Sequence, residues 1–193
     1  MSKETDILLT SNEVEKELKR VNYQSRYIKI LKSTIVTLVV VAAIATIIAS
    51  FFLSVLEING SSMSPTLKQG QMVVAYKDKK IERGEIIAFY HGNKILIKRV
   101  IANQGDFVNI DSDGNVYVDG KLVLEPYISK KSLGNCNIKF PYQVPDGHYF
   151  VLGDNRDTSI DSRNSVIGVI AKEDILGKVL ISIWPINKMG RVK

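Results

Sequence analysis

The chain contains one long apolar segment, followed by many short apolar runs. Residues 33–56 hold 24 positions without a charge, and 18 of these positions are apolar. An α-helix rises about 1.5 Å per residue, so this segment makes a helix about 36 Å long, enough to cross a hydrocarbon core of about 30 Å. We therefore predict a transmembrane helix over residues 33–56.

A cleaved secretory signal peptide is the alternative interpretation of this segment. The triplet Ala43-Ile44-Ala45 has the small-x-small pattern of a cleavage site. The apolar region is too long for a signal peptide, however, and it continues past the triplet behind a 32-residue leader. We expect the segment to remain as an anchor.

The distribution of basic residues predicts the orientation of this anchor. Residues 18–32 contain five basic residues and no acidic one, whereas residues 57–71 contain a single base, Lys68. Basic residues favour the cytoplasmic side of a membrane. We predict a single-pass cell-membrane protein with a cytoplasmic tail over residues 1–32 and an extracytoplasmic catalytic domain over residues 57–193.

The part after the anchor has the pattern of a β protein. Short β-branched and aromatic runs are separated by turn pairs such as Asp113-Gly114 and Asp146-Gly147. We predict a mainly β fold, an antiparallel coiled or sandwich-like sheet, with a smaller inserted region at about residues 107–145. The predicted strands lie in residues 86–90, 95–101, 107–110, 115–120, 149–152 and 178–184.

Composition narrows the possible partners. The single cysteine, Cys136, excludes an internal disulfide, and with two histidines it shows no ligand spacing for a metal. We expect no metal and no cofactor. The net charge is +6, but no basic run is interleaved with aromatic residues, so membrane lipid is a better candidate partner than nucleic acid.

The run ILIKRVI, residues 95–101, places two basic side chains in an apolar strand pattern. Successive strand residues point to opposite faces, so either Lys98 or Arg99 must face a packed surface. One interpretation is a half-exposed strand whose long side chains reach water. The other is a desolvated lysine whose lowered pKa makes it a general base.

The stretch NGSSMSPTLKQGQ, residues 59–71, offers hydroxyl groups that such a base requires. Serines before a proline are also ordinary turn residues, which is the simpler interpretation of Ser61, Ser62 and Ser64. A serine becomes a nucleophile only when a partner removes its proton, and a neutral lysine can do this. The residues alone leave both interpretations open.

Two further features of the sequence are candidate parts of a catalytic site. His91 and His148 lie beside glycine turns, and the chain has no GxSxG motif, so we do not expect a Ser-His-Asp triad. The segment GDNRDTSIDSR, residues 153–163, holds five charged residues in eleven. By itself this composition is typical of a solvated loop whose charges neutralise one another.

Taken together and in order, these segments resemble the type I signal peptidases, membrane-anchored serine proteases that remove signal peptides from exported proteins. The similarity covers most of residues 30–185, and its combination of motifs is specific. The matching segments are GSSMSPTL, RGEIIAFY, IKRVIANQGD, EPY and VPDGHYFVLGDNRDTSIDSR.

The resemblance implies roles for individual residues. Ser62 matches the nucleophile of the family and Lys98 its general base, and together they form a Ser/Lys dyad. Ser159 matches a hydroxyl that helps to orient the lysine. Four charged residues match the groups that support the site, namely Asp154, Arg156, Asp161 and Arg163.

The resemblance also implies substrates and partners. They are preproteins that carry signal peptides, membrane lipid and the secretion translocon. Because signal peptides end in small residues, we expect a shallow apolar pocket and a substrate bound as an extended strand. Met63 either lines this pocket or simply packs, and both interpretations stay open.

The sequence departs from the family pattern at two places. Some members carry a serine two residues before the nucleophile as an oxyanion donor worth about 3 kcal/mol, but this chain has Gly60, as in the Gram-positive branch. The spacing from Arg163 to Gly168 also differs from members with an aromatic pair there.

Two other functions are alternatives to that of a signal peptidase. A self-cleaving repressor protease also uses Ser and Lys, but the anchor and the lack of a DNA-binding domain argue against it. The second rival is an inactive anchored β-domain that binds export machinery or cell-wall components.

Overall fold

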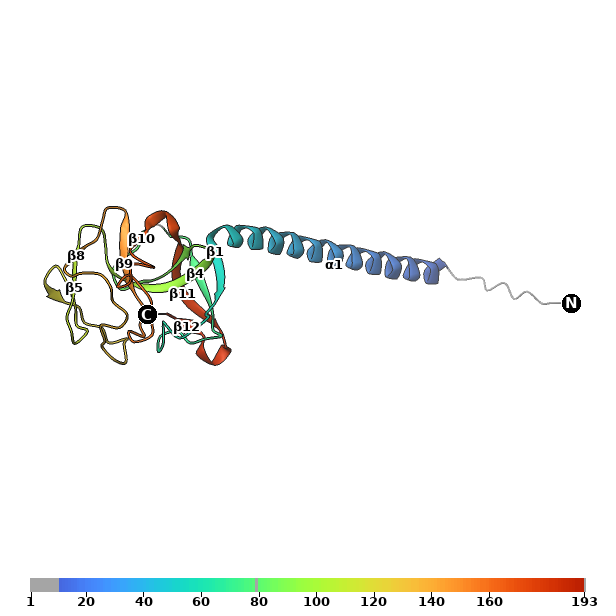
Figure 1. Cartoon of the computed structure of the whole chain (residues 1–193). Coiled ribbons are helices and arrows are strands. Elements are labelled where there is room, and N and C mark those ends of the chain that lie inside the picture. The colour runs from blue at the N-terminus through green and yellow to red at the C-terminus, as the bar shows by residue number, and fades with distance from the viewer. Residues whose placement is uncertain (1–10, 79, 193) are drawn as a thin grey trace. The chain divides into compact units, whose positions relative to one another are not determined.

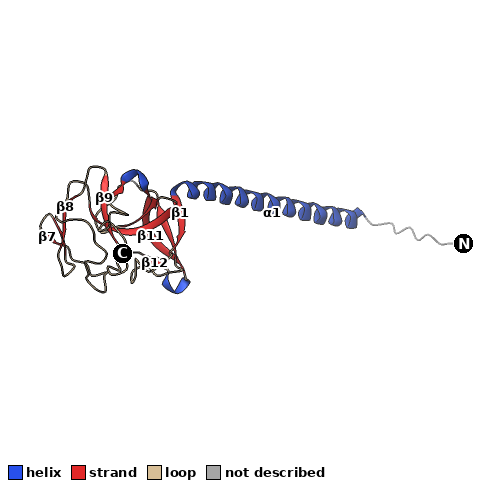
Figure 2. Cartoon of the chain, viewed as in Figure 1, coloured by secondary structure: helices blue, strands red, loops and turns tan. Residues whose placement is uncertain are grey.

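The computed structural model describes residues 11–78 and 80–192 of the chain. It contains two compact units, a helical unit that ends at Phe51 and a β-rich unit that begins at Phe52. Figure 1 traces both units by residue number, and Figure 2 shows that the second unit consists of strands and loops with short helical turns.

The helical unit is formed by α1 (Ser11–Phe52), which has 42 residues and contains a window with a mean hydropathy of 2.7. It is long and apolar enough to cross a membrane. Helix α1 ends four residues before the end of the predicted span, because residues 53–56 belong to a strand. Its portion over residues 33–52 still measures about 30 Å.

The β-rich unit contains two antiparallel sheets. The large sheet has the order β1-β2-β11-β3-β4-β9-β10, and β12 pairs with β11. Its strands are β1 (Leu53–Glu57), β2 (Met72–Tyr76), β3 (Ile86–His91), β4 (Lys94–Ala102), β9 (His148–Leu152), β10 (Ile170–Ala171), β11 (Ile175–Trp184) and β12 (Gly190–Arg191).

The small sheet lies within the region 107–145 and has the order β7-β6-β5-β8. In Figure 1, β5 and β8 lie together at one end of the β-rich unit. The strands are β5 (Phe107–Ile110), β6 (Val116–Val118), β7 (Lys121–Leu122) and β8 (Tyr142–Gln143). The β-rich unit also contains the 3-10 helices η1 (Lys172–Asp174) and η2 (Ile186–Lys188).

The predicted fold class is confirmed, since every strand pairing is antiparallel and each predicted run overlaps a strand. Strand β2 was missed, although its alternating burial is typical of a half-buried strand. Strand β1 was assigned to the membrane span because its residues continue the apolar run.

The core consists of three apolar clusters. One joins the two sheets, since it contains Val108 and Val118 of the small sheet together with Phe150 of β9. A second contains Met63 and Leu67, so the turn after β1 is part of the core. The third packs between strands β3, β4 and β9. The clusters thus fix the turn and β4, the two segments with the predicted nucleophile and base.

We predict that Phe150→Ala destabilises the β-rich unit by about 3–5 kcal/mol, because the ring is fully buried and contacts Phe140 and Tyr142. Urea unfolding of the detergent-solubilised chain, followed by circular dichroism, measures this loss. Phe107→Ala is the control, since this ring is 48% exposed. Equal losses in both variants would contradict the assignment of Phe150 to the core.

Candidate active site

Ser62 lies in the turn that follows β1. The turn is held by two backbone hydrogen bonds, from the Ser64 N–H to the Ser61 carbonyl and from the Leu67 N–H to the Met63 carbonyl. Met63 and Leu67 are buried in the core, whereas Ser62 is half-buried. The flanking residues therefore anchor the turn and leave the Ser62 hydroxyl accessible.

Lys98 lies in β4, opposite Ile87 of β3. Its Nζ atom is 2.9 Å from the Ser62 Oγ atom, which is a hydrogen-bond distance, and the lysine is only 4% exposed. Strand β4 and the turn after β1 thus bring together the two residues that the motifs indicated.

Burial lowers the pKa of Lys98 below its ordinary value, because it penalises the ammonium form. The positive charge of Arg163 lowers this pKa further, while the negative charges of Asp161 and Asp154 raise it. In the described part of the chain, no carboxylate forms an ion pair with Lys98. A neutral amine beside a hydroxyl can accept the proton of that hydroxyl.

Among the described residues, Arg99, which follows Lys98 in β4, forms an ion pair, unlike Lys98. Arg99 is 2% exposed and forms two hydrogen bonds with Asp154, at 2.9 Å and 2.7 Å. It also donates to the Gly84 carbonyl and lies 3.9 Å from the ring centre of Tyr127. Both bases of the run are therefore buried, and the interpretation that they reach water is wrong.

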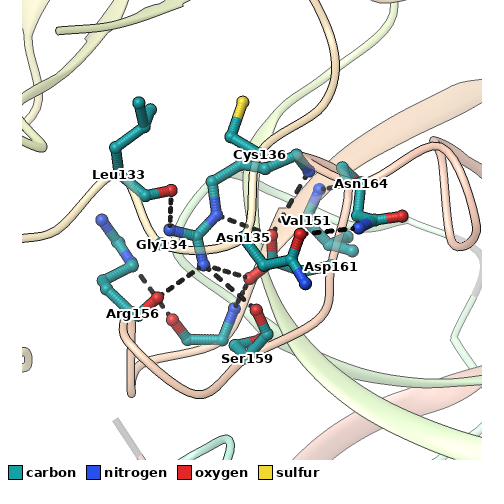
Figure 3. Close-up of polar contacts among 12 residues, drawn as sticks. Leu133, Gly134, Asn135, Cys136, Val151, Arg156, Ser159, Asp161 and Asn164 are labelled. Atoms are coloured by element: carbon teal, nitrogen blue, oxygen red, sulfur yellow. Dashed lines mark hydrogen bonds and ion pairs between the residues drawn. The ribbon is translucent and has the colours of Figure 1, made fainter. Parts of the chain in front are cut away.

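Asp161 and Arg163 form a fully buried ion pair, with Arg163 Nε donating to Asp161 at 2.8 Å. Asp161 also accepts the Gly153 N–H at 2.9 Å. The guanidinium of Arg163 donates to the carbonyls of Leu133 and Arg156. Figure 3 shows Leu133, Arg156 and Asp161 among the residues of this network. This network fixes the fold of the loop 153–163. Four of the five charged residues of the loop are buried, and only Asp157 is exposed, so the interpretation of a solvated loop is wrong for most of its charges.

Ser159 is fully buried, and its Oγ atom has no hydrogen-bond partner within the described residues. It packs against Gly153, where a Cβ atom would lie 2.2 Å from Ser159 Oγ and 2.6 Å from the Ser62 carbonyl oxygen. Only glycine fits at this position. Ser159 therefore lies close to the Ser62 backbone but does not hydrogen-bond to Lys98.

Asp154 and Arg156, which the resemblance placed in one group, do not pair with each other. Asp154 pairs with Arg99, whereas Arg156 pairs with Glu125, both fully buried, and donates to the Gly153 carbonyl. Glu125 lies in the segment EPY, and no local pattern in the sequence indicates its pairing with Arg156.

Asn155 was also missed, although it connects the loop directly to the turn that contains Ser62. Its backbone N–H donates to the Ser62 carbonyl at 3.0 Å, and its side chain donates to the Ser61 carbonyl at 3.3 Å. Its position between two charged residues of the GDNR motif was the only available signal. Pairings across such distances along the chain cannot be derived from spacing.

The remaining candidates lie away from this pair. His91 ends β3, and the ring of His148 contacts the Asp146 carbonyl, so neither forms a hydrogen bond with Ser62. Cys136 contacts the Ile138 carbonyl. Among the described residues, no group of three His, Cys, Asp or Glu side chains is arranged to hold a metal ion.

A small pocket of about 80 Å³ adjoins Ser62 and Lys98. Its walls come from the end of β1 and the following turn on one side and from the first half of β4 on the other. Met63 is both buried in the core and part of the pocket wall. The remaining lining residues are Glu57, Ile58, Asn59, Gly60, Ile95, Leu96 and Ile97.

Comparisons with known proteins agree with the motifs. The family model "Signal peptidase, peptidase S26" matches residues 31–184. Signal peptidase IB of Staphylococcus aureus (strain Mu50 / ATCC 700699) is 36% identical over 182 residues, covering 83% of this chain and 93% of its own. Signal peptidase I of Bacillus licheniformis is 33% identical over 167 residues, covering 80% and 89%.

A solved structure is also similar. The crystal structure of a signal peptidase I from Enterococcus faecalis V583 has 30% sequence identity and a TM-score of 0.42, and it covers 51% of this chain and 96% of its own. The family match over residues 31–184 and the two relatives establish the class of the protein. The chain belongs to the signal peptidase family, peptidase S26, and is an enzyme that cleaves signal peptides from preproteins.

We predict that Gly153→Ala lowers preprotein cleavage at least about tenfold, since its Cβ atom forces Ser62 or Ser159 to move and small displacements at a catalytic site are costly. Cleavage rates of the purified chain in detergent test this. Gly190→Ala is the matched control, because a Cβ there meets nothing within 4 Å. Wild-type activity in Gly153→Ala would show that the close packing does not position the site.

Proposed function

We propose that this protein is a membrane-anchored serine endopeptidase in which Ser62 is the nucleophile and Lys98 the general base. It cleaves preproteins after small residues and releases the exported part. The observation that carries the proposal is the 2.9 Å separation between the buried Lys98 amine and the Ser62 hydroxyl. No carboxylate of residues 11–78 or 80–192 forms an ion pair with this amine. A serine is unreactive without such a base, and burial lowers the pKa of the amine, which favours its neutral form.

In the first half of the reaction, Ser62 Oγ attacks the scissile carbonyl while Lys98 Nζ takes the hydroxyl proton. The new Oγ–C bond forms a tetrahedral intermediate. The C–N bond then breaks, and the Lys98 ammonium gives its proton to the leaving amine. The signal peptide remains as an ester on Ser62, and Lys98 is neutral again.

In the second half, water attacks the ester carbonyl and Lys98 takes a proton from this water. The C–O bond to Ser62 breaks, and the proton passes back to Ser62 Oγ. The signal peptide leaves with a free carboxyl group. One amine therefore serves both halves, and no metal or cofactor enters the mechanism.

Backbone groups near Ser62 supply the oxyanion donor. Within residues 11–78 and 80–192, no acceptor is bonded to the Ser62 N–H, so this donor is available. Gly60 has a φ of 97°, a conformation that favours glycine, and so a serine donor there would be strained. The main-chain donor therefore carries this function without help from residue 60.

The pocket supports recognition of an extended peptide with small side chains. Strand β9 pairs only with the second half of β4, from Arg99 onward, so the edge of Ile95–Lys98 is open within the described chain. A substrate strand can hydrogen-bond to such an edge and present its carbonyl to Ser62. The small volume of about 80 Å³ and its isoleucine-rich wall favour alanine-sized residues.

The proposed location is the cell membrane, with the N-terminus cytoplasmic and the β-rich unit extracytoplasmic. The charge asymmetry around the anchor supports this orientation. One face of the large sheet carries exposed apolar side chains on β1, β2 and β11, and β1 follows the apolar helix directly in the sequence. Such an exposed apolar face is typical of a surface near lipid. The exposed side chains are Leu53, Val55, Met72, Tyr76, Ile181 and Trp184. Membrane lipid and the secretion translocon are the proposed partners there.

We predict that Ser62→Ala and Lys98→Met each lower preprotein cleavage at least about a thousandfold, because each removes one reacting group. The assay incubates the detergent-solubilised chain with a preprotein and locates the cut by mass spectrometry. Ser61→Ala and Lys94→Met are the matched controls, since both side chains are exposed. Cleavage by Lys98→Met at the wild-type rate would remove lysine from the mechanism.

We also predict that kcat/KM rises with pH and then levels off. Lys98 must be neutral to act, and burial places its pKa below 10.5. Below that lowered pKa the amine is protonated and inactive, so activity is lost as the pH falls through it. Initial rates measured from acid to alkaline pH report this midpoint. A flat profile, or a midpoint above about 10.4, the value of a free lysine, would contradict the proposal.

A further inference from the structure

Thr66 lies four residues after Ser62 and faces a buried charge. Its hydroxyl donates a hydrogen bond to Asp154 Oδ2. The same oxygen accepts a hydrogen bond from Arg99 Nη2 at 2.7 Å, and Asp154 Oδ1 accepts one from Arg99 Nε at 2.9 Å. The side chain of Asp154 is fully buried and that of Arg99 nearly so. Their burial and pairing fix the position of the Asp154 carboxylate that Thr66 contacts.

This chain of hydrogen bonds connects the two segments that carry the reacting atoms. At one end, Thr66 belongs to the turn that contains Ser62. At the other end, Arg99 directly follows Lys98 in β4 and pairs with both neighbouring strands, opposite Ile86 and Leu152. Any movement of the turn relative to β4 must therefore stretch or break the bond from Thr66 to Asp154.

The other attachments of the turn are backbone hydrogen bonds between Ile58 and the segment 70–71, contacts with Asn155, and apolar packing. Asn155 holds the carbonyls of Ser61 and Ser62, and thus connects the turn to the loop 153–163. Met63 and Leu67 pack in the core, where apolar contacts are not directional. The Thr66 hydroxyl adds a directional hydrogen bond to Asp154, and Asp154 is in turn bound by Arg99 of β4.

We propose that Thr66 is a positioning residue that holds Ser62 Oγ at hydrogen-bond distance from Lys98 Nζ through Asp154 and Arg99. The inference rests on the proposed function of Ser62 and Lys98. Without the Thr66 hydroxyl, the turn shifts relative to β4, and the Ser62 hydroxyl no longer aligns with the amine. Misplacement of reacting groups by about 1 Å can lower a rate about a hundredfold.

The test replaces Thr66 by valine, which has the same shape but no hydroxyl, in the full chain in detergent. We expect a kcat at least about tenfold lower and a KM within about twofold, since the turn holds the reacting group rather than the substrate. Thr66→Ser keeps the hydroxyl and is expected to retain at least about a third of kcat. Thr158→Val, an exposed threonine in the loop 153–163, is the matched control.

The pH profile supplies a readout that a loss of folded protein does not change. The Lys98 amine donates a hydrogen bond to Ser62 Oγ, so loss of this contact changes the relative stability of the ammonium and neutral forms. The midpoint of kcat against pH is therefore expected to differ from the wild-type midpoint in Thr66→Val. The other charges that act on Lys98, those of Asp161, Asp154 and Arg163, are unchanged by this substitution.

The outcomes separate this inference from the proposed function. A wild-type kcat and pH midpoint in Thr66→Val, with Ser62→Ala inactive, would overturn the positioning role alone. Equal losses in Thr66→Ser and Thr66→Val would also overturn it, because the hydroxyl would then be irrelevant. Full cleavage by Ser62→Ala would instead refute the proposed function. Rates are expressed per folded protein, measured by thermal unfolding of each variant.

Discussion

The proposed chemistry depends on Lys98, which is buried and, among the described residues, has no anionic partner. A buried ammonium normally pairs with a carboxylate, and such a pair keeps the amine protonated. Lys98 instead lies 2.9 Å from the Ser62 hydroxyl, and burial lowers its pKa. The rest of the site must therefore keep carboxylates close enough to organise the loop but away from direct contact with this amine.

The surrounding ion pairs meet this requirement. Asp154 is bound by Arg99, Asp161 by Arg163, and Glu125 by Arg156. Each buried carboxylate has its own guanidinium, and a planar guanidinium satisfies both oxygens of a carboxylate. Such pairs cost desolvation energy and contribute little net stability, so their value lies in orientation. The Arg99–Asp154 pair connects the loop 153–163 to β4, and no ion pair among the described residues includes Lys98.

The sequence predicted the fold class and the two central residues for different physical reasons. Strands with β-branched runs and turn pairs were evident from local pattern, whereas β1 continued an apolar run and could not be separated from the anchor. The proximity of Ser62 and Lys98 followed only from the resemblance, because spacing of 36 residues carries no distance information. The partners of Arg99 and Arg156 depend on tertiary packing, and no local pattern distinguishes one buried ion pair from another.

The direct passage from α1 into β1 limits the reach of the enzyme. Ser62 follows Phe52 by ten residues, a contour of at most about 36 Å even if fully extended. In the proposed topology, this short tether confines the reacting serine to a thin layer above the lipid head groups. A folded exported domain is excluded from that layer unless an unstructured stretch connects it to the cleavage point. In the proposed topology, the length of chain beside the membrane therefore selects substrates together with the residues at the cut.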